Sequence, residues 1–148
     1  MNAAELVQEV YSSLEQKDAE RALSLLADDF AFSGATPVPL NKHEWVGVVS
    51  ALTAAMPDFS FGYRLSKEEG SKVEGTVNLT GTQSNELVLP MPGVPRVAAT
   101  GRKVALPREK VELDTRDGQI TLLKVENLPN GGVPGILQQL GVSLPESG

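Results

Sequence analysis

The stretch from Val104 to Glu126 reads VALPREKVELDTRDGQITLLKVE. Apolar and polar residues alternate along most of it, which is typical of strands that bury one face. The dipeptide Asp117-Gly118 divides the stretch and is a strong signal for a tight β-hairpin. Pro107 interrupts the first half, and proline within a sheet is confined to edges, strand ends and bulges. The stretch therefore predicts two antiparallel strands joined by a hairpin, with a bulge or strand edge at Pro107.

Two segments upstream show the same alternation, Phe59–Leu65 and Val73–Gln83. The segment from Pro90 to Gly101 contains three prolines and two glycines, so we expect an irregular loop there. Together with the hairpin, these segments predict a four-stranded antiparallel meander.

Helical spacing of apolar residues dominates the N-terminal third of the chain. The first predicted helix carries an apolar stripe from Leu6 to Leu14. A second, short helix follows Asp18, a suitable N-cap residue, and its apolar positions include Leu26. A third begins at Asn41, with Glu44 placed to complete a capping box, and stops before Pro57. A short fourth helix, residues 133–141, closes the pattern, and the order predicts an α+β fold in one domain spanning residues 1–148.

Composition excludes several kinds of chemistry. The 148 residues include no cysteine, which excludes disulfides, thiol nucleophiles and thiolate zinc sites. They include a single histidine, His43, which argues against a metal site. The net charge of −6 argues against a nucleic-acid partner. Seven acidic and two basic residues fall in the first 29 positions, so we expect the acidity to form a solvated helix face. With neither a signal peptide nor a membrane-spanning run, we expect no membrane partner and a cytoplasmic location.

Five short motifs occur in order along the chain: Met56-Pro57-Asp58-Phe59, Gly81-Thr82-Gln83, Thr100-Gly101-Arg102-Lys103-Val104, Asp117-Gly118-Gln119-Ile120 and Leu137-Gln138-Gln139-Leu140-Gly141-Val142. Together they resemble the SnoaL-like polyketide cyclases and the related ester cyclases of the nuclear transport factor 2-like superfamily. The resemblance covers about residues 3–145.

The resemblance implies a cone-shaped, curved antiparallel sheet with three N-terminal helices on its concave side and a short C-terminal helix. A strand is implied between the second and third helices. It further implies a homodimer through the convex side of the sheet, and a pocket for a small hydrophobic or polyketide-like molecule. The best-known family members close a polyketide ring by an intramolecular aldol step, without metal or cofactor, using a pocket carboxylate as general acid or base.

The chain departs from that family at both positions of chemical interest. Gln83 stands where the family usually has a histidine, and glutamine does not accept a proton near neutral pH. The family's aspartate falls at Lys110 or Val111, depending on the motif from which one counts. Glu109 is the candidate that remains, because it shares strand parity with Val111 and Leu113. A carboxyl in an apolar pocket has its pKa raised toward the range useful for acid–base catalysis. The alternative is that Pro107 displaces the strand and Glu109 pairs with a base at the rim.

The remaining candidates are weaker. Asp58 is a second catalytic candidate, at the mouth of the proposed pocket, or else a turn residue. Gln83 lies on the apolar side of its strand, where it binds either a ligand or a neighbouring side chain. Trp45 and Tyr63 are preferred ligand-binding residues because each ring carries a polar group, and Tyr11 is a further candidate.

Two functions from different classes follow. The first is a cofactor-independent cyclase, isomerase or hydrolase in which Glu109 acts as acid or base. The second is a non-catalytic protein, either a binder of a hydrophobic ligand or a dimeric interaction module.

Overall fold

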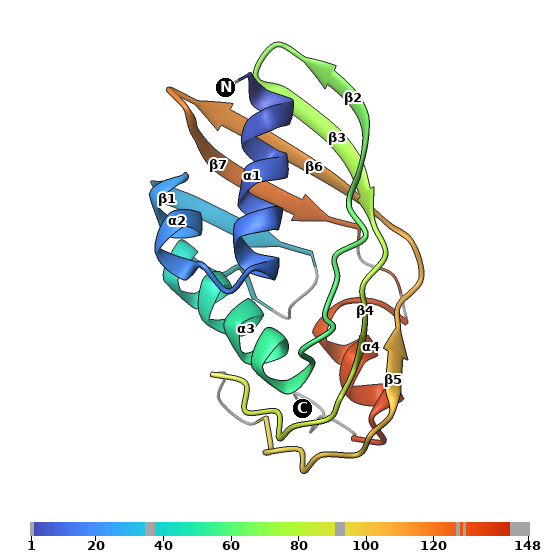
Figure 1. Ribbon diagram of the computed structural model, residues 1–148. Coiled ribbons are helices and arrows are strands. Elements are labelled where there is room, and N and C mark those ends of the chain that lie inside the picture. The colour runs from blue at the N-terminus through green and yellow to red at the C-terminus, as the bar shows by residue number, and fades with distance from the viewer. Residues whose placement is uncertain (1, 35–37, 91–93, 127, 129, 143–148) are drawn as a thin grey trace.

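A computed structural model describes residues 2–34, 38–90, 94–126, 128 and 130–142. Five strands form the main sheet, in the order β1-β7-β6-β3-β2 (Figure 1). Their bounds are β1 (Leu26–Ser33), β2 (Arg64–Glu69), β3 (Lys72–Val77), β6 (Glu109–Arg116) and β7 (Gln119–Val125). Strands β2, β3, β6 and β7 pair antiparallel, which confirms the predicted meander. Strand β1 pairs parallel with β7; the family resemblance implied this strand, whereas the apolar spacing did not reveal it.

A second, two-stranded sheet continues the first where the chain bends. It consists of β4 (Thr80–Thr82) and β5 (Lys103–Ala105). At the bend, the Asn78 side-chain amide donates to the Leu106 carbonyl at 2.6 Å, and Pro107 follows directly. The break at Pro107 was predicted, but one continuous strand over Val73–Gln83 is wrong, because Asn78 and Leu79 separate β3 from β4.

The predicted strand over Phe59–Leu65 is also wrong in its bounds. Only its last two residues belong to β2, and Leu65 is 51% exposed. Phe59 and Phe61 are buried, but they precede the strand, and Gly62 adopts a left-handed conformation with φ of 59°. The left-handed glycine interrupts the extended backbone, so no strand forms before it. The apolar alternation arises instead because the rings of Phe59 and Phe61 both pack into the core.

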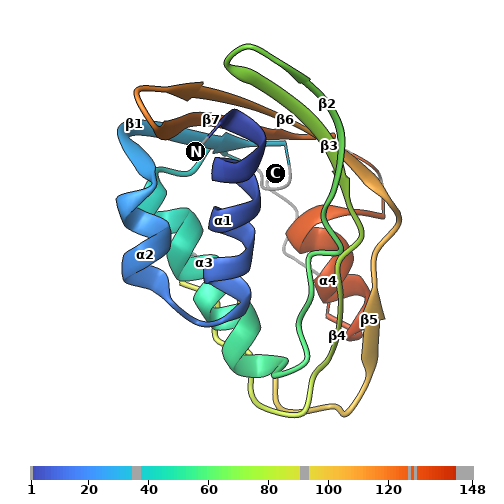
Figure 2. The same cartoon turned by 45° about the horizontal axis from the view of Figure 1, so that its top comes forward.

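The three N-terminal helices cover one face of the main sheet (Figure 2). They are α1 (Ala3–Glu15), α2 (Ala19–Ser24) and α3 (Lys42–Ala55). The Asp18 side chain caps α2, and Asn41 and Glu44 form the predicted capping box of α3. Helix α3 ends two residues before Pro57, as expected. Leu26 was predicted in the second helix but begins β1 instead.

The last helix, α4 (Gly132–Gln139), packs beside β5 (Figures 1 and 2). Asp117 and Gly118 have φ of 52° and 78°, as a tight hairpin between β6 and β7 requires. Of the predicted Pro90–Gly101 loop, residues 91–93 lie outside the described residues. No helix in the described part of the chain is long and apolar enough to cross a membrane.

Candidate functional site

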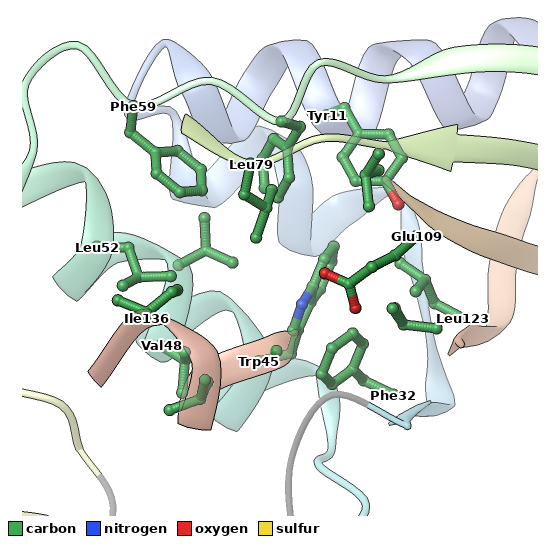
Figure 3. Close-up of a pocket in the computed structure, with 16 residues that line it drawn as sticks. Tyr11, Phe32, Trp45, Val48, Leu52, Phe59, Leu79, Glu109, Leu123 and Ile136 are labelled. Atoms are coloured by element: carbon green, nitrogen blue, oxygen red, sulfur yellow. The ribbon is translucent and has the colours of Figure 1, made fainter. Parts of the chain in front are cut away.

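A cavity of about 60 Å³ lies between the sheet and helices α1, α3 and α4 (Figure 3). Its walls are almost entirely apolar and aromatic. The lining residues are Tyr11, Phe32, Trp45, Val48, Val49, Leu52, Phe59, Phe61, Val77, Leu79, Glu109, Leu123, Val125, Gly132, Val133 and Ile136. Among these residues, Glu109 carries the one carboxyl group, and none carries a basic side chain.

Glu109 is the first residue of β6 and pairs with Val77 of β3. Its side chain is 1% exposed and lies on the buried face of the strand with Val111 and Leu113, while Lys110 is exposed. The alternation of β6 therefore places the carboxyl inward, and Pro107 does not displace it.

Burial raises the pKa of the Glu109 carboxyl above its usual value of 4.5. The backbone N–H of Gly132 lowers the pKa, which opposes part of that effect. The negative charge of Glu126 raises the pKa further. Among the described residues, Oε2 of Glu109 has no hydrogen-bond partner. The cavity wall thus contains a buried carboxyl group whose pKa is raised and which has one oxygen without a hydrogen-bond partner among the described residues.

Tyr11 and Trp45, both predicted ligand-binding residues, supply the other side-chain donors of the lining. Burial, and to a smaller extent Tyr63, raises the pKa of the Tyr11 hydroxyl above its usual value of 10.0, so it stays protonated at neutral pH. The Trp45 ring packs against two phenylalanines of β1, with centroid distances of 5.5 Å to Phe30 and 5.6 Å to Phe32. The contacts with these rings hold the indole against the cavity wall.

Tyr63 lies one layer outside the cavity. Its ring stacks on Tyr11 with centroids 4.8 Å apart and lines a surface groove beside Leu65. Burial raises the pKa of the Tyr63 hydroxyl, with a smaller contribution from Glu68. This hydroxyl has no hydrogen-bond partner in the part of the chain that the structure describes. Tyr63 therefore packs against the Tyr11 ring without lining the cavity itself.

Asp58 lies on the surface, away from the cavity. Its carboxylate accepts hydrogen bonds from the backbone amide of Thr82 at 2.7 Å and the Thr82 hydroxyl at 2.9 Å. These two bonds hold the pKa of Asp58 below its usual value. Asp58 therefore tethers the turn after α3 to β4.

Gln83 is fully buried, and its hydrogen bonds go to the following loop. Its amide nitrogen donates to the carbonyls of Val97 at 3.0 Å and Ala98 at 3.2 Å. Its oxygen accepts from the Thr100 hydroxyl at 2.6 Å and the Thr100 amide at 3.2 Å. Of the two alternatives that the sequence left open, the structure shows neighbouring groups as its partners.

His43 is exposed in the first turn of α3. Within the described ranges, no group of three or more His, Asp or Glu side chains is placed to hold a metal ion.

Sequence reasoning did not identify the start of α4 as part of the site. Gly132 and Val133 line the cavity, and Gly131 lies against the Glu109 carboxyl. The signal available was the Gly131-Gly132 pair just before an apolar helix, since paired glycines often mark a close approach of the backbone to another group.

A SnoaL-like domain model matches residues 7–123, so the chain belongs to the SnoaL-like family. IdmH from Streptomyces antibioticus, a proposed polyketide cyclase, has a TM-score of 0.66 and 23% identity over 96% of this chain and 100% of IdmH. AclR from Streptomyces galilaeus, a proposed hydroxylase, has a TM-score of 0.69 and 18% identity over 94% of this chain and 95% of AclR.

A proposed polyketide cyclase from Xanthomonas campestris pv. campestris gives a TM-score of 0.62 and 21% identity over 84% of this chain and 88% of that one. At these identities the likeness shows the fold, which is that of the nuclear transport factor 2-like proteins. Among curated proteins, none matches the sequence.

Proposed function

We propose that this protein is a cofactor-independent enzyme that moves a proton on a small, uncharged, apolar molecule, with Glu109 as the general acid or base. The observation that supports this most is a buried carboxyl with one unpartnered oxygen inside an otherwise apolar cavity. Perturbed carboxyls in such cavities are typical of acid–base catalysts. Membership in the SnoaL-like family supports a small-molecule-binding, cyclase-like role.

The lining restricts the substrate to molecules without a formal charge. No lining residue among those described can neutralise a phosphate or a carboxylate, and burying such a group unpaired is costly. An aromatic or polyketide-like ketone fits the wall, because it presents flat apolar surface and a carbonyl oxygen for the donors of Tyr11 and Trp45.

The proposed proton transfer needs no reagent other than Glu109 and the substrate. The Glu109 carboxylate takes a proton from the carbon beside a carbonyl, and the C–H electron pair becomes the carbon–carbon double bond of an enolate. The negative charge develops on the carbonyl oxygen, where a hydrogen bond from Tyr11 stabilises it. In a cyclase the enolate carbon then attacks a second carbonyl of the same molecule, and the alkoxide that forms takes the proton back from Glu109. In an isomerase the enolate takes the proton back at another carbon.

The cavity must enlarge to accept such a substrate. An engineered protein cavity of about 150 Å³ binds benzene, whereas this cavity has about 60 Å³. We therefore expect ligand binding to move side chains of the wall, and the affinity to include that cost.

Acetophenone is a suitable probe, since it is uncharged, contains one aromatic ring and has exchangeable protons beside its carbonyl. In D₂O we expect the protein to accelerate deuterium incorporation at the methyl group, followed by ¹H NMR. Glu109→Gln is expected to reduce this acceleration by about 10²–10⁴-fold, with the affinity from ligand-observed NMR retained. Equal exchange in both proteins would refute the role of Glu109.

A non-catalytic binding protein is the second candidate. It is favoured by the two family positions, since Gln83 lies outside the cavity and neither Lys110 nor Val111 carries a carboxyl group. Acetophenone binding without any accelerated exchange would support it. The predicted homodimer stays a proposal, which sedimentation or light scattering of the purified protein would test.

A further inference from the structure

Helix α4 begins without a capping side chain of its own. Its N-cap residue is Gly131, which makes no side-chain hydrogen bond. Pro134, in the first turn, has no N–H to donate. The carboxyl of Glu109, which belongs to β6, lies against this helix start instead, and the backbone N–H of Gly132 lowers its pKa. A residue of the sheet thus contacts the helix end that lacks a capping side chain.

Gly131 lies against the Glu109 carboxyl, and no feature of its own backbone demands a glycine. Its φ of −109° and ψ of −177° are extended values that any residue adopts. A Cβ at this position would lie 2.8 Å from Oε2 and 2.9 Å from Cδ of Glu109, closer than van der Waals contact allows. The Glu109 carboxyl therefore occupies the space that a side chain at position 131 would fill.

Gly132 contributes in a different way. Its φ of 65° is the left-handed region that favours glycine, and this conformation leads the chain into α4. Its backbone N–H lowers the pKa of the carboxyl. The two glycines together leave room for the carboxyl against the backbone, and Oε2 has no hydrogen-bond partner in the described structure.

We propose that Gly131 and Gly132 are positioning residues, which hold the Glu109 carboxyl against the start of α4, where it lines the cavity. The catalytic meaning of this arrangement rests on the proposed function, whereas the arrangement itself does not. Two other titratable groups bear on the carboxyl: Tyr11, which also lines the cavity, and Glu126, whose charge acts from the end of β7.

The test is Gly131→Ala in the full chain, read by ¹³C NMR titration of the glutamate carboxyls with Glu109→Gln to assign the resonance. The new Cβ pushes the carboxyl off the Gly132 amide, so the interaction that lowers its pKa weakens. We expect the titration midpoint of Glu109 to move to higher pH. Gln138→Ala is the matched control, because Gln138 is exposed on the same helix, and it should leave the midpoint unchanged. A midpoint in Gly131→Ala that equals the wild-type midpoint would overturn the proposal.

A double variant, Glu109→Asp with Gly131→Ala, shows whether any loss of stability in Gly131→Ala comes from its contact with the Glu109 carboxyl. The shorter aspartate withdraws the carboxyl from the added methyl group, so we expect the urea midpoint lost in Gly131→Ala to be largely recovered. No recovery would mean that the alanine clashes with something else, and the proposal would fail.

The two proposals fail separately. A shifted midpoint with no acetophenone exchange in the wild type would leave the positioning role standing and remove the catalytic one. An unchanged midpoint with normal exchange would do the reverse.

Discussion

Replacing Glu109 by glutamine is expected to make the protein more stable at alkaline pH. The folded-state pKa of this carboxyl is raised above the ordinary value of 4.5 by burial. Below that value the group is protonated in both states and its ionisation contributes nothing. As the pH rises further, the unfolded chain ionises first while the folded protein keeps its proton, so the free energy of unfolding falls until the folded pKa is passed. Glutamine keeps the shape of the glutamate side chain and an acceptor oxygen for the Gly132 N–H, and it does not ionise.

The size of the effect follows from the surroundings of the carboxyl. Each unit by which folding raises a pKa corresponds to about 1.4 kcal/mol. A buried polar group without a partner costs about 1–3 kcal/mol, and more when charged, and Oε2 is such a group in the described structure. We therefore expect the difference in unfolding free energy between variant and wild type to rise by about 1–3 kcal/mol from about pH 5 to about pH 8.

Urea denaturation at these two pH values measures the difference. Circular dichroism follows the helices, and Trp45, the one tryptophan of the chain, gives an independent fluorescence signal. Glu112→Gln is the matched control, since Glu112 is exposed on the same strand. A gap between Glu109→Gln and wild type that is the same at both pH values, or that turns against the variant at the higher pH, would refute the reasoning.

Four further predictions concern the rest of the site. Gln83→Ala removes four hydrogen bonds from the following loop and should lower the unfolding free energy by about 2–4 kcal/mol; a loss below that range in urea denaturation would contradict its role. Thr82 lowers the pKa of Asp58, so the wild type loses stability when acid protonates this carboxylate. Asp58→Asn should lack this loss, and an equal fall of the unfolding free energy with acid in both proteins would speak against it. Ile136→Ala, in the cavity wall, should cost about 2–5 kcal/mol and tighten binding of ligands larger than acetophenone, and weaker binding would count against the need for enlargement. Tyr11→Phe should slow acetophenone exchange by about 10²-fold at little cost in stability, and an unchanged rate would exclude the hydroxyl from the reaction.

Local signals predicted the elements whose causes are local. The caps at Asp18 and Asn41 and the hairpin at Asp117-Gly118 depend on side chains and dihedral angles within a few residues, so the sequence contains them completely. Strand parity also placed Glu109 on the same face as Val111, and the structure agrees.

Features that depend on distant partners could not be predicted in this way. Strand β1 pairs with residues of β7 that lie more than ninety positions later, and its residues Asp28 and Asp29 break the alternation that identifies a strand. The predicted Val73–Gln83 strand divides where the Asn78 side chain donates a hydrogen bond to the carbonyl of the distant Leu106. The role of Gly131 is visible only when β6 and α4 are placed together, because nothing within its own segment demands a glycine.

The proposed function requires an uncharged ligand to contact Glu109 inside the apolar cavity. A crystal structure of the protein soaked with acetophenone tests that most directly. We expect electron density for the ring between Trp45 and Glu109, with the methyl carbon facing a Glu109 oxygen and the carbonyl oxygen about 2.5–3.0 Å from the Tyr11 hydroxyl. Acetophenone found only on the outer surface, with the cavity walls closed as they are here, would contradict the account.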